Sequence, residues 1–136
     1  MFQYKVILAI SVLAIGILIS ASGAMARGTD GAIRRINACN DQFADKGLRA
    51  CVAGAFDQFA GALTSSNSVS SASPVARSTA AGLRGAASRA AAVSVLQRAQ
   101  SMISNLASGS SGNARENYHI VNRAFSRALA VINTKG

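Results

Sequence analysis

The sequence contains few large apolar side chains. If residues 1–26 are set aside as an N-terminal secretion signal, the remaining 110 residues hold 22 Val, Ile, Leu and Phe residues and 23 alanines. A chain of this length and composition forms one domain with a thin core, and it excludes a large multi-domain enzyme. Only about one residue in five is therefore large and apolar, which is close to the level of disordered chains. The fold has to be established from the local pattern of apolar residues.

Motifs for catalysis and for metal binding are also missing. The chain has one histidine, His119, and lacks the short patterns of hydrolase nucleophiles, phosphate-binding loops and zinc proteases. The only acidic residue near His119 in the sequence is Glu116, and most serines lie in low-complexity stretches that give a nucleophile no rigid support. Two cysteines without a neighbouring histidine supply at most half of a metal site. We therefore expect a protein that is not an enzyme and needs no metal or cofactor.

Only one long apolar run is present, and it lies at the N-terminus. Residues 6–19 carry no charge, they follow the single positive charge of Lys5, and small residues at Ala24 and Ala26 end the segment. This order is typical of a secretory signal, so we predict cleavage after Ala26 and export to the periplasm or the medium. An uncleaved membrane anchor is the alternative, although serine and glycine dilute the second half of the run.

The two cysteines support export, because an even number in an exported chain indicates a disulfide. In one straight helix Cys39 and Cys51 would stand about 18 Å apart, at ~1.5 Å per residue, whereas a disulfide needs Cα atoms about 5.5 Å apart. A disulfide between them therefore requires a chain reversal, which we predict at residues 44–47 with Gly47 supplying a positive φ. Free thiols and pairing between chains are the alternatives.

Apolar residues recur at helical spacing along the mature chain, and no segment alternates as a strand does. We therefore predict an all-α fold, a small Ala-rich helical bundle. Its expected parts are a helical hairpin over 27–63, a flexible Ser-rich linker over 64–74, and a two-helix segment over 75–136. The two-helix segment consists of one long helix over 75–107 and an amphipathic helix over 114–133. The clearest apolar stripes are Leu48, Val52, Ala55, Phe59 and Leu63 in the hairpin and Tyr118, Val121, Phe125, Leu129 and Ile132 in the last helix.

Positive charge is the strongest functional signal. The chain carries 14 Lys and Arg against five Asp and Glu, and removal of the signal takes away only Lys5, which leaves a net charge of +8. No acidic residue occurs between Gln58 and Ala114. Eleven of the 13 remaining basic residues are arginines, which favour bidentate contacts with phosphate or carboxylate. A field of this sign attracts anionic surfaces.

Two basic stripes are candidates for anion binding. Three arginines at multiples of seven share one face of the predicted long helix, and three arginines and the histidine recur every four residues on the last helix. These residues are Arg77, Arg84 and Arg98, and Arg115, His119, Arg123 and Arg127. The last helix has three interpretations, namely a bundle helix with a charged outer face, an amphipathic helix on an anionic membrane, and a surface that tracks phosphates. Export and the lack of a base-reading module argue against nucleic acid.

These features predict a small exported cationic protein that binds an anionic envelope component, either a membrane or a polysaccharide, or a partner protein. A structural subunit that self-associates or joins a surface apparatus is the alternative, because the core is thin and helices of small residues pack closely against partners.

Overall fold

The computed structural model describes residues 25–135, which are 86% helical and contain five helices and no strand. The first helix covers residues 25–42. It is followed by α2 (Asp45–Thr64), α3 (Ala72–Gly85), α4 (Arg89–Ser108) and α5 (Gly112–Lys135). The prediction of an all-α fold is confirmed. Residues 1–24, which carry nearly all of the predicted signal, lie outside the described residues, and the predicted cleavage point after Ala26 falls in the first turn of the helix over 25–42.

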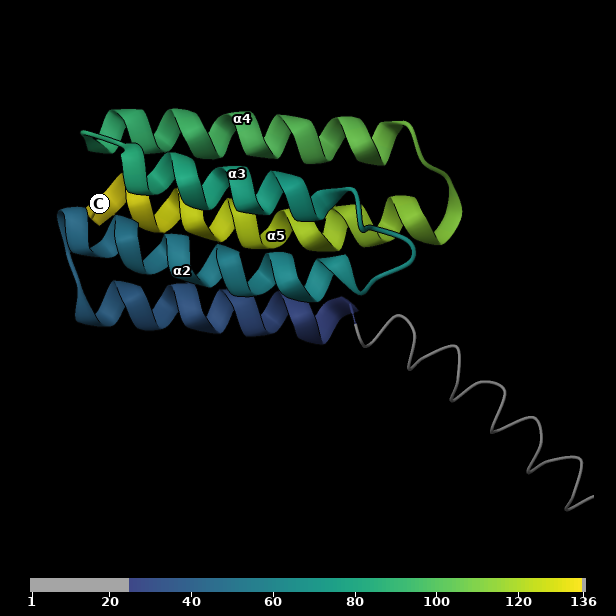
Figure 1. Ribbon diagram of the computed structural model, residues 1–136, viewed down its shortest axis with the longest axis horizontal. Coiled ribbons are helices and arrows are strands. Elements are labelled where there is room, and N and C mark those ends of the chain that lie inside the picture. Colours follow the sequence, from purple (N-terminus) through teal and green to yellow (C-terminus); the bar gives the residue numbers. More distant parts are fainter. Residues whose placement is uncertain (1–24, 136) are drawn as a thin grey trace, which may run out of the picture.

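The helices pack side by side with their long axes nearly parallel (Figure 1). Consecutive helices run in opposite directions, and the helix over residues 25–42 lies at the edge of the bundle beside α2. This first helix therefore runs in the same direction as α5, and Lys135 at the end of α5 contacts Asn40 near the end of the first helix. Because the connections are short, helices that follow each other in sequence become neighbours in space.

The core joins all five helices. Phe56 of α2 and Phe125 of α5 are fully buried, and their rings stack with centroids 4.7 Å apart. The predicted stripe of α2 is buried along its whole length, and that of α5 is buried except for Leu129, which is half-buried. Alanines fill much of the remaining contact, which allows the helices to approach closely although each alanine buries little area. The predicted segments 27–63 and 75–136 thus share one hydrophobic core.

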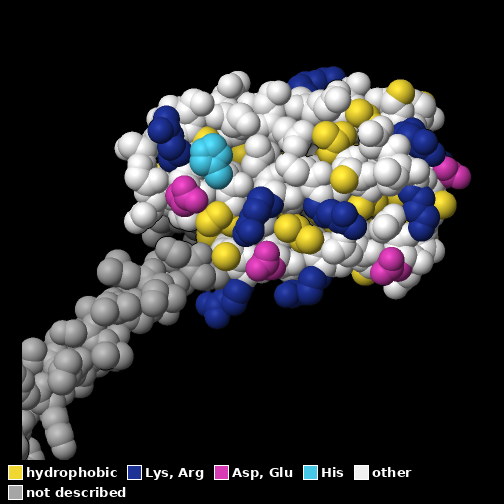
Figure 2. All heavy atoms as spheres, turned by 180° about the vertical axis from the view of Figure 1, so that it is seen from behind, with side chains coloured by type: hydrophobic (Ala, Val, Ile, Leu, Met, Phe, Trp, Pro, Cys, Tyr) yellow, Lys and Arg dark blue, Asp and Glu magenta, His cyan; other side chains and the backbone are white. Residues whose placement is uncertain are grey.

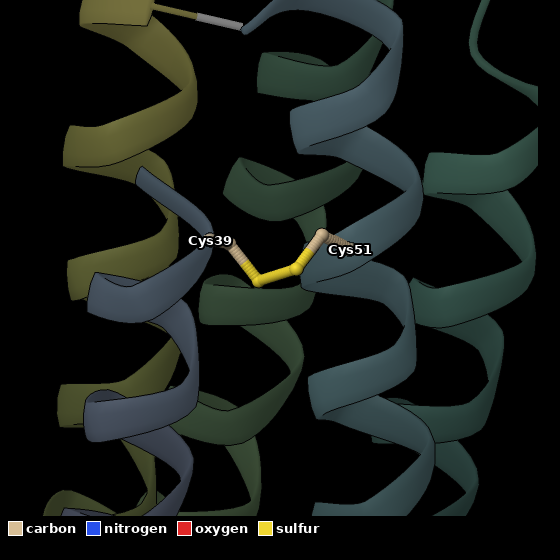
Figure 3. Close-up of a disulfide and its surroundings, with 2 residues drawn as sticks. All are labelled: Cys39 and Cys51. Carbon is tan, nitrogen blue, oxygen red and sulfur yellow. A yellow bond between two sulfur atoms is a disulfide. The ribbon is translucent and has the colours of Figure 1, made fainter. Parts of the chain in front are cut away.

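The disulfide between Cys39 and Cys51 is present and joins the first helix to α2 (Figure 3). The two Cα atoms are 5.7 Å apart, as a hairpin allows and a straight helix does not. The reversal differs in detail from the prediction. It occurs at residues 43–44, and the positive φ of 51° belongs to Asp45. Gly47 lies inside the first turn of α2, where the ring of Phe43 packs against it. A short acidic side chain tolerates the left-handed region better than most, so glycine is not required.

The predicted Ser-rich linker over 64–74 is shorter in the structure, since helices take up both of its ends. Only residues 65–71 separate α2 from α3, because Ala72, Ser73 and Pro74 already belong to α3, whose first turn tolerates proline. Val69 is fully buried. The hydroxyl of Ser73 donates to the carbonyl oxygen of Ala60 at 2.9 Å and lies 2.7 Å from the Thr64 hydroxyl. Serine is therefore used here to satisfy backbone and side-chain hydrogen bonds.

The predicted long helix over 75–107 is two antiparallel helices, α3 and α4. The chain turns at Ala86–Ser88, where Ala86 and Ser88 adopt extended backbone conformations. Ser88 caps α4, since its side chain accepts a hydrogen bond from the backbone N–H of Ala91 at 3.1 Å. Alanine on both sides of the turn has high helix propensity, so the sequence pattern continues as a helix through the turn and gives no sign of it.

The last helix also begins earlier than predicted. α5 starts at Gly112, whose φ is +60°, so Asn113 belongs to its first turn. Glycine adopts this conformation without the steric cost that a side chain would impose.

Candidate functional site

The predicted basic stripe of α5 lies largely along the first helix, and its residues are exposed. Arg123 pairs with Asp30 at 3.9 Å, and the Nε of Arg127 donates to the Oδ1 of Asn37 at 2.6 Å. At the last residue of α5, Lys135 donates to the carbonyl oxygen of Asn40. Because the two helices run in parallel, these contacts follow the same order in both. Part of the stripe therefore fastens the first helix to α5.

The other two members of the stripe differ. The Nε of Arg115 donates to the carbonyl oxygen of Ala107 at 3.3 Å, near the C-terminal end of α4. A cation is favourable there because the last carbonyl groups of a helix carry partial negative charge. His119 is exposed and makes no hydrogen bond or ion pair within residues 25–135.

The predicted face of Arg77, Arg84 and Arg98 does not exist, because the turn at Ala86–Ser88 places Arg98 on a different helix. Arg84 pairs with Asp57 of α2 at 2.6 Å, and Arg77 donates to the hydroxyl of Thr64 of α2 at 3.3 Å. Both α3 arginines thus reach α2, whose acceptors are also seven residues apart. Arg98 belongs to α4 and lines the groove between α4 and the side of α3 that faces away from α2.

Most of these contacts leave the positive charge available. Only Arg84 and Arg123 pair with carboxylates, whereas Arg77, Arg115 and Arg127 donate to neutral oxygens. A guanidinium has five N–H donors, so a single neutral acceptor leaves donors for a phosphate or carboxylate ligand. Arg98 has no hydrogen bond or ion pair within the described part of the chain.

The positive charge is spread over the surface. On the face that carries the histidine, Lys and Arg side chains lie among Asp and Glu side chains and do not merge into one patch (Figure 2). The helices α3 and α4 carry four arginines and no acidic residue. The distribution suits contact with an extended anionic surface better than capture of one small anion.

The sequence patterns did not indicate one further cluster. Arg49 of α2 and Arg89 of α4 line a cavity of about 580 Å³ together with Asp45 and Asn133. Arg49 is only 8% exposed. The cavity forms because α2 and α4 both begin at the same end of the bundle, and no local spacing in the sequence encodes that.

Among the described residues, no helix has the length and apolar character needed to cross a membrane. Within the same residues, no group of three or more His, Cys, Asp and Glu side chains could hold a metal ion. In comparisons with protein-family models, curated proteins and solved structures, nothing matches this chain.

Proposed function

We propose that this chain is an exported, non-enzymatic protein that binds an anionic surface of the cell envelope through dispersed arginines. The observation that carries the proposal is the uncompensated charge of Arg77, Arg98, Arg115 and Arg127, which lie exposed on three helices. Arg84 and Arg123 contribute less, because each already lies within ion-pair distance of a carboxylate, Asp57 at 2.6 Å and Asp30 at 3.9 Å.

The physical basis is long-range attraction completed by short contacts. Each arginine offers a planar set of donors to phosphate or carboxylate groups, and the net charge of +8 after signal removal raises the encounter rate. Salt screens exposed charges over about 10 Å at 0.1 M and over about 3 Å at 1 M. Binding should therefore weaken steeply as the salt concentration rises.

The test uses the mature protein with anionic phospholipid vesicles, zwitterionic vesicles and an anionic polysaccharide. We expect binding to the anionic surfaces at low salt, with loss of binding when salt is raised to about 0.5 M. Absence of binding at low salt, or binding that does not change with salt, would overturn the proposal. Binding to vesicles alone or to the polysaccharide alone identifies the component.

A matched pair of double variants tests which arginines matter. The variant with Arg77→Gln and Arg115→Gln and the variant with Arg84→Gln and Arg123→Gln each remove one charge from α3 and one from α5. Both should weaken binding through the lost field. The variant at Arg77 and Arg115 should weaken binding further than the other, because these two arginines have N–H donors free for direct contacts with the anionic surface. Equal losses of binding in the two variants would contradict a role of these arginines in direct contacts.

The alternative of a self-assembling structural subunit was motivated by a core too thin to close alone. The buried core of one chain supports the binding function instead, since only Phe43 and Met102 expose large hydrophobic side chains among the described residues. Sedimentation of the mature protein at micromolar concentration separates the two functions. A monomer supports the binding function, and an oligomer supports the structural subunit.

A further inference from the structure

A groove runs between α3 and α4 on the side of α3 that faces away from α2. Two adjoining cavities of about 460 Å³ and about 250 Å³ form it. Val75, Ser78 and Met102 line both cavities, so the two spaces are continuous. One end of the groove lies at Ser71, directly before α3, and the other at Gly82, eleven residues further along the chain. That separation corresponds to about 16 Å, or three turns of helix.

The shape of the groove follows from one close helix contact. A Cβ atom at Gly82 would stand 2.8 Å from the Cγ1 atom of Val95, so α3 and α4 touch there at the distance that only glycine permits. Farther from the turn at Ala86–Ser88, the residues that face the space include Ser78 of α3 and Ser71 directly before α3, whose side chains are too small to fill it. The groove therefore stays open toward its far end.

The chemistry of the groove combines an apolar floor with a single charge. Val75 and Leu106 contribute to the floor, and Met102 is 46% exposed within it. Serine and asparagine supply neutral polar groups. Arg98 is the only charged residue in the lining, and α3 and α4 contain no acidic residue that could satisfy it.

The charge of Arg98 and the open shape of the groove together indicate which kind of ligand fits it. An anionic group is required opposite Arg98, and an apolar face is required opposite Met102 and Val75. Sites for small molecules enclose 70–90% of the ligand surface, roughly, which an open groove does not do. A helix needs to bury only one face, and an apolar groove of three turns matches that mode of recognition.

We propose that the groove between α3 and α4 docks an acidic amphipathic helix of a partner protein. The apolar face of that helix covers Met102 and Val75, and a carboxylate at its edge pairs with Arg98. This site shares Arg98 with the dispersed arginines that are proposed to bind the anionic surface, but Arg77, Arg115 and Arg127 lie outside the groove, so the two kinds of binding can be tested separately.

The test measures the binding of a labelled, helix-stabilised peptide by fluorescence anisotropy with the mature protein. The peptide has leucines on one face and glutamates along the edges, and a second peptide has lysines in place of the glutamates. We expect the acidic peptide to bind at least about tenfold more tightly than the basic one, since its charges oppose the sign of the groove. Equal binding of the two peptides would overturn the proposal.

Two substitutions locate the peptide, each with a control on α4. Ser78→Trp fills the groove and should lower affinity more than about tenfold, whereas Gln97→Trp adds the same ring on an exposed part of α4 outside the groove and should leave affinity unchanged. Arg98→Gln should weaken binding about three- to tenfold, and Arg89→Gln, with the same loss of charge outside the groove, should weaken it less.

Further outcomes distinguish this inference from the proposed function. Loss of vesicle binding with the Arg77 and Arg115 variant while the peptide still binds supports two separate sites. Unchanged peptide binding to Ser78→Trp would overturn docking in the groove. Displacement of the peptide by a fatty acid at a one-to-one ratio would also overturn it, because an acyl chain would then be the occupant.

Discussion

Arginines on two sides of the bundle have different surroundings. Along the α5 side, Arg123 and Arg127 reach Asp30 and Asn37 of the first helix, and these contacts join residues about 90 positions apart in the sequence. Between α3 and α4, Arg98 lies in an apolar groove and has no such contact within residues 25–135. The difference shows that the neighbouring helix decides whether an exposed arginine ties helices together or stays available for a ligand.

The two sides also differ in how completely they are packed. The interface of α2 and α5 contains the stacked rings of Phe56 and Phe125, which are fully buried. The interface of α3 and α4 touches at Gly82 and Val95 and then opens over Met102. A closed interface contributes to stability, whereas an open one with an exposed apolar floor is suited to a partner.

Truncation of one large side chain on each side tests this difference most strongly. Phe125→Ala should lower the free energy of unfolding by about 3–5 kcal/mol, because it removes a fully buried ring and leaves a cavity against Phe56. Met102→Ala should cost less than about 1 kcal/mol, since nearly half of that side chain is already in water. Urea denaturation measures both values, and similar losses would show that the groove is as tightly packed as the core.

Removal of the disulfide should have the next largest effect. Replacement of Cys39 and Cys51 by alanine should lower the free energy of unfolding by about 3 kcal/mol, because the unfolded chain regains the entropy that the closed loop removes. Hydrogen exchange should increase first in the first helix and then in the part of α5 that contacts it through Arg127. Increased exchange in α3 and α4 before the first helix would contradict this order.

The sequence predicted the features that depend on local spacing or on simple geometry. The stripes of α2 and α5 were found because burial of one helix face imposes a period of 3.6 residues. The disulfide was found because a bridge between Cys39 and Cys51 requires a reversal, although the sequence indicated Gly47 for a conformation that Asp45 adopts. Other features could not be predicted, because no local pattern in the sequence marks them. The turn at Ala86–Ser88 interrupts an Ala-rich stretch of high helix propensity, so Arg98 was assigned to the wrong face.

The candidate site was less predictable than the fold for the same reason. Exposure of the basic residues follows from the amphipathic pattern, but their partners come from other helices. Nothing in the spacing of Arg127 indicates that Asn37 accepts its hydrogen bond. The groove around Arg98 depends on the separation of α3 and α4, which the contact of Gly82 with Val95 sets.

Alanine at two glycines should change stability in opposite directions. Gly61→Ala on the exposed face of α2 should stabilise by about 0.5–1 kcal/mol, because a Cβ atom there meets open space and alanine favours the helix. Gly82→Ala should destabilise by about 1 kcal/mol net, since Val95 is a stiff neighbour and the strain exceeds that gain. Thermal or urea unfolding measures both. In a Val95→Ala background, Gly82→Ala should become stabilising, and a destabilisation that persists there would contradict the steric explanation.

The smallest expected effect separates a tying arginine from an available one. A double-mutant cycle of Arg127→Ala and Asn37→Ala should give a coupling energy of about 0.5–1 kcal/mol, because the hydrogen bond is 2.6 Å long but exposed to water. Arg98→Ala should leave the free energy of unfolding within about 0.5 kcal/mol of the unsubstituted protein, since this side chain makes no hydrogen bond or ion pair within the described residues. Urea denaturation at low salt measures these values. A coupling energy of zero for Arg127, or a clear loss of stability with Arg98→Ala, would remove the distinction between the two sides of the bundle.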